Sequence, residues 1–306
     1  MVGAAILFPG QGAQFEGMGR DWCEADETAR ETFAEADRIL GFELSTLCWE
    51  RGDEVNRTDV AQPGIFVTSV AVVRALERRG LERGAAAATC GLSLGEYSAL
   101  WCAGSLDFAD GLRLVRLRGE AMQAASEATP SGMTSLMGAD EVQAETLAAV
   151  GAERGICSVA NLNAPGQIIL SGELTALDAI ESAAPDHGVR RTRRLVVAGG
   201  FHSECMRPAA ERLEVALREV EIRPPAVPFF SNVNAAATDD PARIAAQLAA
   251  QVCSPVLWQR TIQGLLDSGV GEFLEPAPGR VLAGLMKKID RQVSVSSAAT
   301  PQDVKA

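Results

Sequence analysis

Histidine and basic charge are scarce in this chain of 306 residues. It contains two histidines. Its 40 aspartates and glutamates outnumber its 28 lysines and arginines, which gives a formal net charge of −12. An acidic chain has no global field that attracts phosphate backbones, so no nucleic-acid partner is expected. The two histidines stand in separate places and the cysteines are unpaired, and so no metal site and no bound cofactor are expected.

Long apolar runs and paired cysteines are also missing. No run of 18 apolar residues occurs, which argues against a membrane-spanning helix. The apolar residues 4–8 lack a basic flank and lead into Pro9 and Gly10, so they predict a buried first strand and not a signal peptide. Seven scattered cysteines without a C-x-x-C pair argue against a disulfide framework or zinc site. We therefore expect reduced core thiols in a cytoplasmic protein.

The chain is rich in apolar residues, and their spacing predicts strands that alternate with helices. With 47% hydrophobic residues, a chain of this length should bury roughly 75% of its unfolded surface. Helical spacing at residues 26–40 and 107–125, with short apolar runs at 4–8 and 85–90, predicts an α/β fold. A further helix is expected at 65–76, opened by Gln62 and Pro63, and the polar tail from Ser294 is expected to be loosely held.

Residues 131–197 show a different order of strand and helix patterns. Strand patterns at 133–137, 156–162, 167–171 and 189–197 enclose helical patterns at 140–150 and 174–184. This order, βαββαβ, is that of the ferredoxin-like unit. We therefore expect a ferredoxin-like subdomain at 131–197, inserted into a discontinuous large α/β subdomain formed by 1–130 and 198–306.

The sharpest motif is G-x-S-x-G at residues 91–95, placed where an apolar strand turns into a helix. Glycines permit a tight turn that exposes the Ser93 hydroxyl, and the helix start offers free N–H groups to an oxyanion. Ser93 is thus a candidate nucleophile, the alternative being a turn serine that caps the helix.

A nucleophilic serine needs a base, and the choice lies between His187 and His202. His187 falls in a polar loop, which favours a solvated residue, whereas His202 follows the junction back into the large subdomain. Asp140, Asp178 and Asp186, which lie between Ser93 and His202 in the chain, fall in the predicted insertion and not on a strand of the large subdomain. This disfavours an ordinary esterase triad and favours a Ser-His dyad.

The sequence resembles the malonyl-CoA:acyl carrier protein transacylases and the related acyltransferases of polyketide synthases. The segments that carry the resemblance span nearly the whole chain: residues 8–12 (FPGQG), 62–63 (QP), 91–100 (GLSLGEYSAL), 118–119 (RG), 161–167 (NLNAPGQ), 201–203 (FHS), 231–233 (SNV), 251 (Q) and 278–279 (PG). The resemblance implies an α/β hydrolase-like core, with a parallel sheet and helices, that carries the ferredoxin-like subdomain.

The resemblance also implies roles for individual residues. Ser93 would attack the thioester of an acyl-CoA while His202 takes its proton, and the backbone N–H groups of Gln11 and Leu94 would bind the oxyanion. A backbone carbonyl near Gln251 would orient the histidine. The acyl group would then pass to the phosphopantetheine thiol of an acyl carrier protein.

The resemblance also implies that Arg118 selects the substrate, because a guanidinium can pair with the free carboxylate that distinguishes malonyl from acetyl. The alternative is a surface arginine paired with Glu120. Phe201 resembles the bulky residue of malonyl-selecting polyketide enzymes, which leaves little room for an α-methyl branch. The remaining residues expected at the substrate are Gln62, Leu92 and Gln251.

Two positions depart from the family pattern. Leu92 stands where the family usually has histidine, and Gly199 and Gly200 precede Phe201. In having an apolar residue at this position, the chain resembles the stand-alone acyltransferases of modular assembly lines. This likeness favours a role in polyketide synthesis over one in fatty-acid synthesis. The open alternatives are transfer of another acyl group between carriers, hydrolysis of acyl groups from stalled carriers, and a non-catalytic carrier-binding module.

Carrier proteins are generally acidic, so this acidic chain must offer a local basic surface. The candidates for carrier docking are Arg190, Arg191, Arg193, Arg194, Arg207, Lys287 and Lys288. For the arginine run, the alternative is protection of an exposed edge strand against aggregation. We expect the chain to act as a monomer on two partners, an acyl-CoA and an acyl carrier protein.

Overall fold

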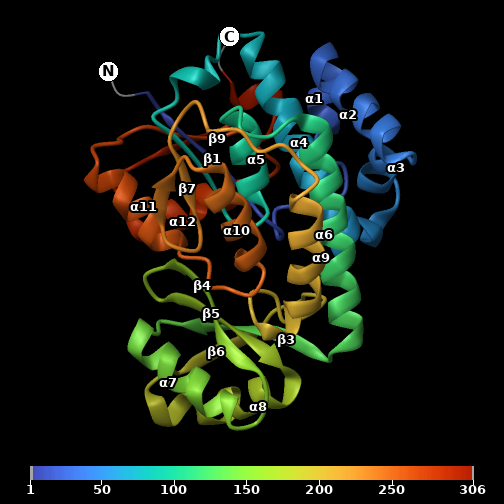
Figure 1. The fold of residues 1–306 in the computed structure, drawn as a ribbon. Helices are drawn as coiled ribbons and strands as arrows, with labels where there is room; N and C mark the ends of the chain where they lie inside the picture. The colour runs from blue at the N-terminus through green and yellow to red at the C-terminus, as the bar shows by residue number, and fades with distance from the viewer. Residues whose placement is uncertain (1–2, 305–306) are drawn as a thin grey trace.

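Two β-sheets organise the chain in the computed structural model, which describes residues 3–304. In Figure 1 a large α/β unit occupies the upper part of the molecule and a smaller unit projects below it. The smaller unit is formed by the middle of the chain, and the larger one by the segments before and after it.

The large unit is built on a six-stranded sheet in which all neighbouring strands are parallel except the last pair. In spatial order its strands are β10 (Val295–Ser297), β9 (Phe273–Glu275), β1 (Ala5–Phe8), β2 (Ala88–Gly91), β7 (Phe229–Ser231) and β8 (Ala236–Thr238). A parallel sheet needs helices on both faces, so the predicted α/β class is confirmed.

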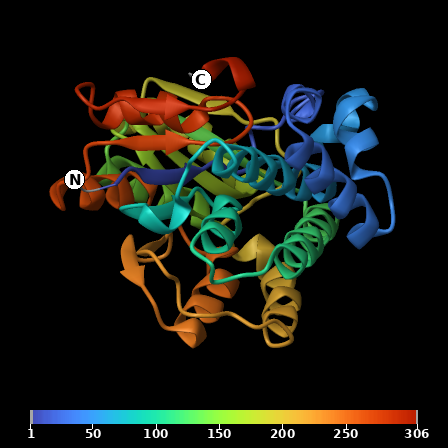
Figure 2. The ribbon, with the colours of Figure 1, turned by 90° about the horizontal axis from the view of Figure 1, so that it is seen from above.

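Side chains of β1 alternate between the two faces of this sheet, as the period of a strand requires. Ala5 and Leu7 pack with α11 (Trp258–Asp267) and α12 (Val281–Ile289). Ile6 and Phe8 belong to the larger core on the opposite face, with α4 (Thr58–Glu77), α5 (Gly95–Cys102) and α6 (Phe108–Ala128). Figure 2 shows the sheet between these two layers of helices.

Shorter elements complete the large unit. The remaining helices are α1 (Arg20–Ala25), α2 (Glu27–Leu40), α3 (Leu44–Trp49), α9 (Arg207–Leu217) and α10 (Pro241–Gln251). Short 3₁₀-helices of the large unit are η1 (Gly52–Asn56), η2 (Arg83–Ala85), η4 (Glu204–Met206) and η5 (Pro301–Asp303), whereas η3 (Ala184–His187) belongs to the small unit.

The start of α4 corrects the sequence prediction, because the helix begins at Thr58 and contains Pro63. A proline inside a helix cannot donate to the carbonyl four residues earlier, here that of Asp59. Arg116 Nη1 on α6 donates to this carbonyl instead, at 2.7 Å. α4 is also apolar enough to cross a membrane, but 94% of its most apolar window is buried in the fold, as expected of a core helix.

The small unit is a four-stranded antiparallel sheet in the order β4, β5, β3, β6. Its elements are β3 (Ser131–Met137), α7 (Glu141–Ala152), β4 (Cys157–Ala164), β5 (Gln167–Glu173), α8 (Leu174–Ala183) and β6 (Arg191–Arg194). Both helices share one core with the sheet, which confirms the ferredoxin-like arrangement. β6 is shorter than predicted, and subdomain limits at 131 and 197 stay a prediction.

The prediction of a loosely held tail is wrong. Residues from Ser294 onward lead into β10, which pairs with β9 and forms an edge of the large sheet. The carbonyl of buried Ala298 accepts a hydrogen bond from Trp22 Nε1 at 3.1 Å. The small polar residues of this tail gave no sign of a partner, because their partners come from distant parts of the chain.

Candidate active site

A strained turn between β2 and α5 presents Ser93. Its φ is 53°, a left-handed conformation that is uncommon outside glycine. A Cβ atom on Gly91 would lie 1.9 Å from the carbonyl carbon of Gly95, and one on Gly95 would lie 2.1 Å from the Phe8 carbonyl oxygen. Only glycines fit at the two flanking positions, and the predicted strand, turn and helix around Ser93 are therefore all present.

Ser93 and His202 are brought together across the large unit. Ser93 Oγ lies 2.8 Å from His202 Nε2, and His202 Nδ1 lies 2.8 Å from the backbone carbonyl oxygen of Gln251. The carbonyl can only accept, so Nδ1 carries the proton and Nε2 is free to accept from the serine. His202 is also left-handed, with φ 60°, and such strain costs about 1–3 kcal/mol per residue.

Burial lowers the pKa of His202 to about 4, and the charge of Arg118 acts in the same direction. The imidazole is therefore neutral at pH 7, as a proton acceptor must be. The other histidine, His187, ends the 3₁₀ turn η3 of the small unit. Asp140 caps α7 and Asp178 pairs with Arg194, so both of these acids are engaged within the small unit.

Asn232 is a central residue of the site that the sequence reasoning missed. Its Oδ1 accepts from the Ser93 backbone N–H at 2.7 Å, and its Nδ2 donates to the Gly91 carbonyl at 2.7 Å. Its own N–H donates to buried Glu96 at 2.5 Å. The S-N-V segment that follows β7 was the available signal, but nothing in it indicates which turn it supports.

Replacing Asn232 with alanine is expected to destabilise the fold, because the buried N–H of Ser93 and carbonyl of Gly91 lose their partner. Each buried group left without a partner costs about 1–3 kcal/mol. Chemical denaturation would measure the loss. Asn234→Ala is the control, since its side chain makes a single exposed hydrogen bond and its loss should change stability by less than about 0.5 kcal/mol. Equal stability of the two variants would contradict this account.

A loop from residue 10 to residue 12 lies against the Ser93 turn. A Cβ on Gly10 would come within 2.3 Å of the Leu92 carbonyl oxygen, so glycine allows this close approach. Within residues 3–304, the backbone N–H groups of Gln11 and Leu94 donate to no protein acceptor. The Gln11 side chain is tied to Thr58 at 3.3 Å. Both predicted oxyanion donors are therefore present with their N–H groups unengaged.

Arg118 is buried in the centre of the site, with 2% of its surface exposed, which excludes the surface alternative. Nη1 donates to Gln62 Oε1 at 2.7 Å, and Nη2 donates to Ser93 Oγ and to Gln251 Oε1, both at 3.0 Å. Its Nε–H has no acceptor among residues 3–304. Burial lowers the pKa of Arg118, but an arginine keeps its charge in proteins. The sequence-predicted residues Gln62 and Gln251 thus hold this guanidinium.

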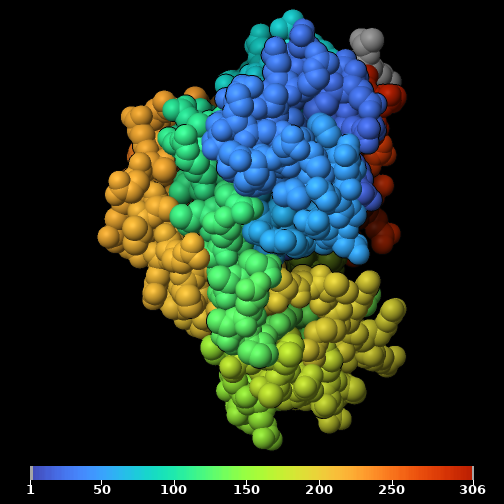
Figure 3. Space-filling view, turned by 90° about the vertical axis from the view of Figure 1, so that its right-hand side faces the viewer, coloured from blue at the N-terminus to red at the C-terminus, as the bar shows by residue number. Residues whose placement is uncertain are grey.

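A cleft of about 790 Å³ leads to these residues from the surface. Its lining includes Ser93, Arg118 and His202, together with the apolar side chains of Leu92 and Phe201. The small unit contributes further lining residues, which are Met133, Asn161, Asn163, Ile169 and 195–197. Figure 3 shows the notch between the light blue N-terminal helices and the yellow part of the small unit. The site therefore lies where the two units meet.

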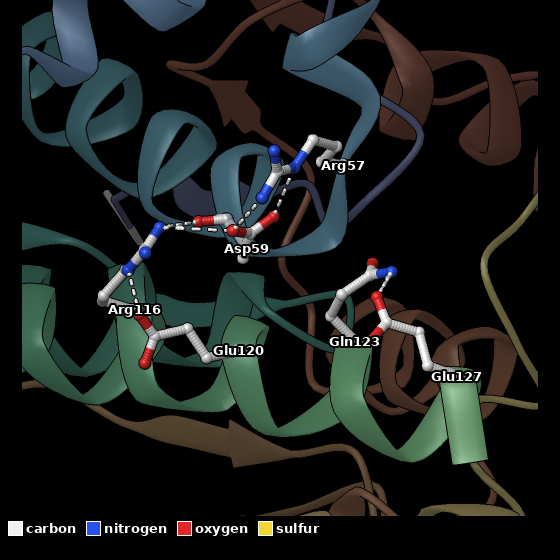
Figure 4. Close-up of polar contacts among 6 residues, drawn as sticks. All are labelled: Arg57, Asp59, Arg116, Glu120, Gln123 and Glu127. Atoms are coloured by element: carbon white, nitrogen blue, oxygen red, sulfur yellow. Dashed lines mark hydrogen bonds and ion pairs between the residues drawn. The ribbon is translucent and has the colours of Figure 1, made fainter.

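Charged side chains at the start of α4 and on α6 form a network of ion pairs that connects the two helices, as Figure 4 shows. Arg57 Nη2 lies 2.9 Å from Asp59, and Arg116 lies 3.7 Å from the same carboxylate and 2.6 Å from Glu120. Arg57 lines the cleft. This network fixes the start of α4, where Thr58 and Gln62 hold Gln11 and Arg118.

The basic residues predicted to dock a carrier protein lie outside the lining of the cleft. Arg194 forms ion pairs with Asp178 and Glu181, both at 2.8 Å, and exposed Arg207 pairs with Glu204. Their charges are therefore already compensated. The candidates at exposed positions that form no ion pair within residues 3–304 are Arg190, Arg191, Arg193, Lys287 and Lys288.

Comparison with known proteins shows the family to which the chain belongs. The family model described as "Acyl transferase domain" matches residues 6–301. The malonyl CoA-acyl carrier protein transacylase of Bacillus subtilis is 39% identical over 98% of this chain and 94% of its own. The mitochondrial malonyl-CoA-acyl carrier protein transacylase of Homo sapiens is 38% identical over 97% of this chain and 79% of its own.

Solved structures show the same likeness. The acyl-carrier-protein-S-malonyltransferase of Bartonella henselae superposes with a TM-score of 0.95 at 39% identity, over 98% of this chain and 96% of its own. A malonyl-transacylase solved with a type II polyketide synthase acyl-carrier protein gives 0.94 at 36% identity, over 98% and 97%. With matches of this extent in sequence and structure, the chain belongs to the acyl transferase domain family.

Proposed function

We propose that this protein is a malonyltransferase, which moves malonyl from coenzyme A to the phosphopantetheine thiol of an acyl carrier protein. The observation that carries the proposal is the buried Arg118, which lies 3.0 Å from the hydroxyl of the proposed nucleophile. A guanidinium at that point can bind the free carboxylate of a malonyl group attached to Ser93. The relatives named above are malonyl transacylases, and one was solved with a carrier protein.

The first half-reaction builds an acyl-enzyme. Ser93 Oγ attacks the thioester carbonyl as His202 Nε2 takes the hydroxyl proton, and the carbonyl of Gln251 holds the imidazole in position. The N–H groups of Gln11 and Leu94 stabilise the oxyanion of the tetrahedral intermediate. Collapse of the intermediate expels coenzyme A, which receives the proton from His202.

The second half-reaction repeats these steps with a different nucleophile. The phosphopantetheine thiol gives its proton to His202 and attacks the Ser93 ester, and Ser93 then recovers the proton as it leaves. Coenzyme A is a substrate here, and no bound cofactor takes part in these steps. Arg190, Arg191, Arg193, Lys287 and Lys288 are the proposed docking contacts for the acidic carrier.

The side chains that line the cleft limit the size of the acyl group that can bind there. Phe201 is buried beside His202, and a rigid ring there leaves little space for an α-methyl branch on the acyl chain. Leu92 lines the same cleft and keeps a polyketide carrier protein among the proposed acceptors, beside one of fatty-acid synthesis. Arg118 favours malonyl transfer over proofreading hydrolysis, because such a hydrolase must accept acyl chains without a carboxylate.

The proposal is tested by mixing the protein with malonyl-, methylmalonyl- or acetyl-CoA and recording its intact mass. We expect a malonyl adduct that is absent in Ser93→Ala and disappears when a phosphopantetheinylated carrier protein is added. Methylmalonyl and acetyl adducts should form more slowly. Loading by acetyl-CoA alone, or release of malonate to water without transfer, would contradict malonyl transfer and favour the hydrolase.

A further inference from the structure

Glu96 is a buried carboxyl group beside the proposed active site that has no part in the chemistry described so far. It lies in the first turn of α5 and has no solvent exposure. One carboxyl oxygen accepts from the Asn232 backbone N–H at 2.5 Å, and the other accepts from the Gln251 side chain. A carboxyl group held in this way can act on the reaction only through its neighbours.

The Gln251 side chain links Glu96 to Arg118. Its Nε2 donates to Glu96, while its Oε1 accepts from Arg118 Nη2 at 3.0 Å. The acidic groups whose charges act on the Arg118 guanidinium are Tyr97 and Glu96, of which only Glu96 is a carboxyl group. Glu96 is therefore placed to compensate the charge of Arg118 when it is ionised and the site holds no substrate.

We propose that the carboxylates of Glu96 and of a bound malonyl group compete for Arg118, so that Glu96 carries a proton whenever malonyl occupies the site. This inference rests on the proposed function. Glu96 acts on Arg118 through the Gln251 side chain, and two carboxylates near one buried guanidinium repel each other. The repulsion is relieved when one of them is protonated. The malonyl carboxylate contacts the guanidinium directly, and so Glu96 takes the proton from solvent.

The surroundings of Glu96 favour its neutral form. Burial raises the pKa of Glu96 to about 8, against the opposing effects of its hydrogen bonds and of the Arg118 charge. Cys90 on β2 and Tyr97 on α5 also act electrostatically on this region, and burial raises the pKa of both, so both are uncharged near neutral pH. At pH 7, Glu96 is therefore protonated in most molecules, and the charge of Arg118 is available to the malonyl carboxylate. Above pH 8, the ionised Glu96 carboxylate competes with malonyl for this charge.

Proton uptake by the unmodified protein is the first test. Malonyl-CoA and acetyl-CoA are loaded in parallel at pH 8 in weak buffer with a pH indicator. At a pH equal to the pKa, roughly half of the molecules lack the proton. We therefore expect malonyl loading to take up about half a proton per molecule more than acetyl loading. Equal uptake overturns the inference, whereas the absence of a malonyl adduct by mass overturns the proposed function itself.

Variants assign the proton to Glu96. Glu96→Gln cannot gain a proton, so the excess uptake should vanish, whereas Glu96→Asp should keep it with a shifted pH midpoint. The matched control is Glu275→Gln, because Glu275 is also fully buried with a raised pKa but binds the start of α12. Excess uptake should persist in this control. Excess uptake that also persists in Glu96→Gln overturns the inference.

The pH dependence of kcat/KM gives a second readout. For malonyl loading by the unmodified protein, kcat/KM is expected to fall by about tenfold per pH unit above pH 8, as the competing carboxylate ionises. Acetyl loading should lack this fall because acetyl does not use Arg118. A malonyl profile that stays level from pH 7 to pH 9 overturns the inference, even if Glu96→Gln loses activity through misfolding.

Discussion

Replacing His202 with alanine is expected to slow malonyl loading onto Ser93 by about 100- to 10,000-fold, the usual contribution of a positioned general base. The geometry supports this size of effect, since His202 Nε2 is 2.8 Å from Ser93 Oγ and its other nitrogen is held by the Gln251 carbonyl. Loading is measured by intact mass over time. His187→Ala is the control, because His187 lies in the small unit, and its loading rate should be unchanged.

The pH profile of loading checks the same role independently. A general base works when it is deprotonated, so a lowered pKa moves the loss of activity to lower pH. Since the pKa of His202 is lowered to about 4, kcat/KM should stay level between pH 7 and pH 5.5. A fall centred near pH 6.5 would instead indicate an ordinary solvated histidine as the base.

Replacing Arg118 with alanine is expected to slow loading from malonyl-CoA by about 10- to 150-fold, while loading from acetyl-CoA is kept or even increased. The estimate assigns about 1.5–3 kcal/mol to the charge-assisted pair with the malonyl carboxylate. The buried position of Arg118, beside Ser93 Oγ, makes this difference between donors the relevant measurement.

A variant of the same helix separates this effect from a general disturbance of α6. Arg113 is exposed on α6 and pairs with Asp110 at 3.1 Å, so Arg113→Ala should leave both loading rates unchanged. If Arg118→Ala slowed both donors equally, the guanidinium would serve the serine or the fold and not the malonyl carboxylate. Direct contact with the Ser93 hydroxyl makes this the alternative to exclude.

Much of the fold could be predicted from local pattern. The short apolar run at 4–8 and the G-x-S-x-G motif identified β1 and the turn after β2, because both features depend on neighbours in the sequence. The βαββαβ order gave the ferredoxin-like unit for the same reason. Ser93 was predicted because it lies in the G-x-S-x-G motif, and His202 because the chain has only two histidines. The structure places the two side chains in contact.

The predictions that failed concern segments whose structure depends on contacts with distant parts of the chain. Pro63 predicted a helix start, but Arg116 from another helix supplies the missing hydrogen bond, and so α4 continues through it. The tail after Ser294 is ordered by its pairing with β9. Asn232 and Glu96 are ordinary residues in the sequence, and their contacts depend on the way β7 and α5 meet.

The strand order of the large sheet has a consequence for how the protein is made. β1, from the N-terminus, is hydrogen-bonded to β9, which lies near the C-terminus. The contacts of the small unit, in contrast, join segments that are near each other in the chain. Local contacts form faster than distant ones, so we expect the small unit to assemble early during synthesis. The sheet that carries the serine turn can close only after the last strands leave the ribosome.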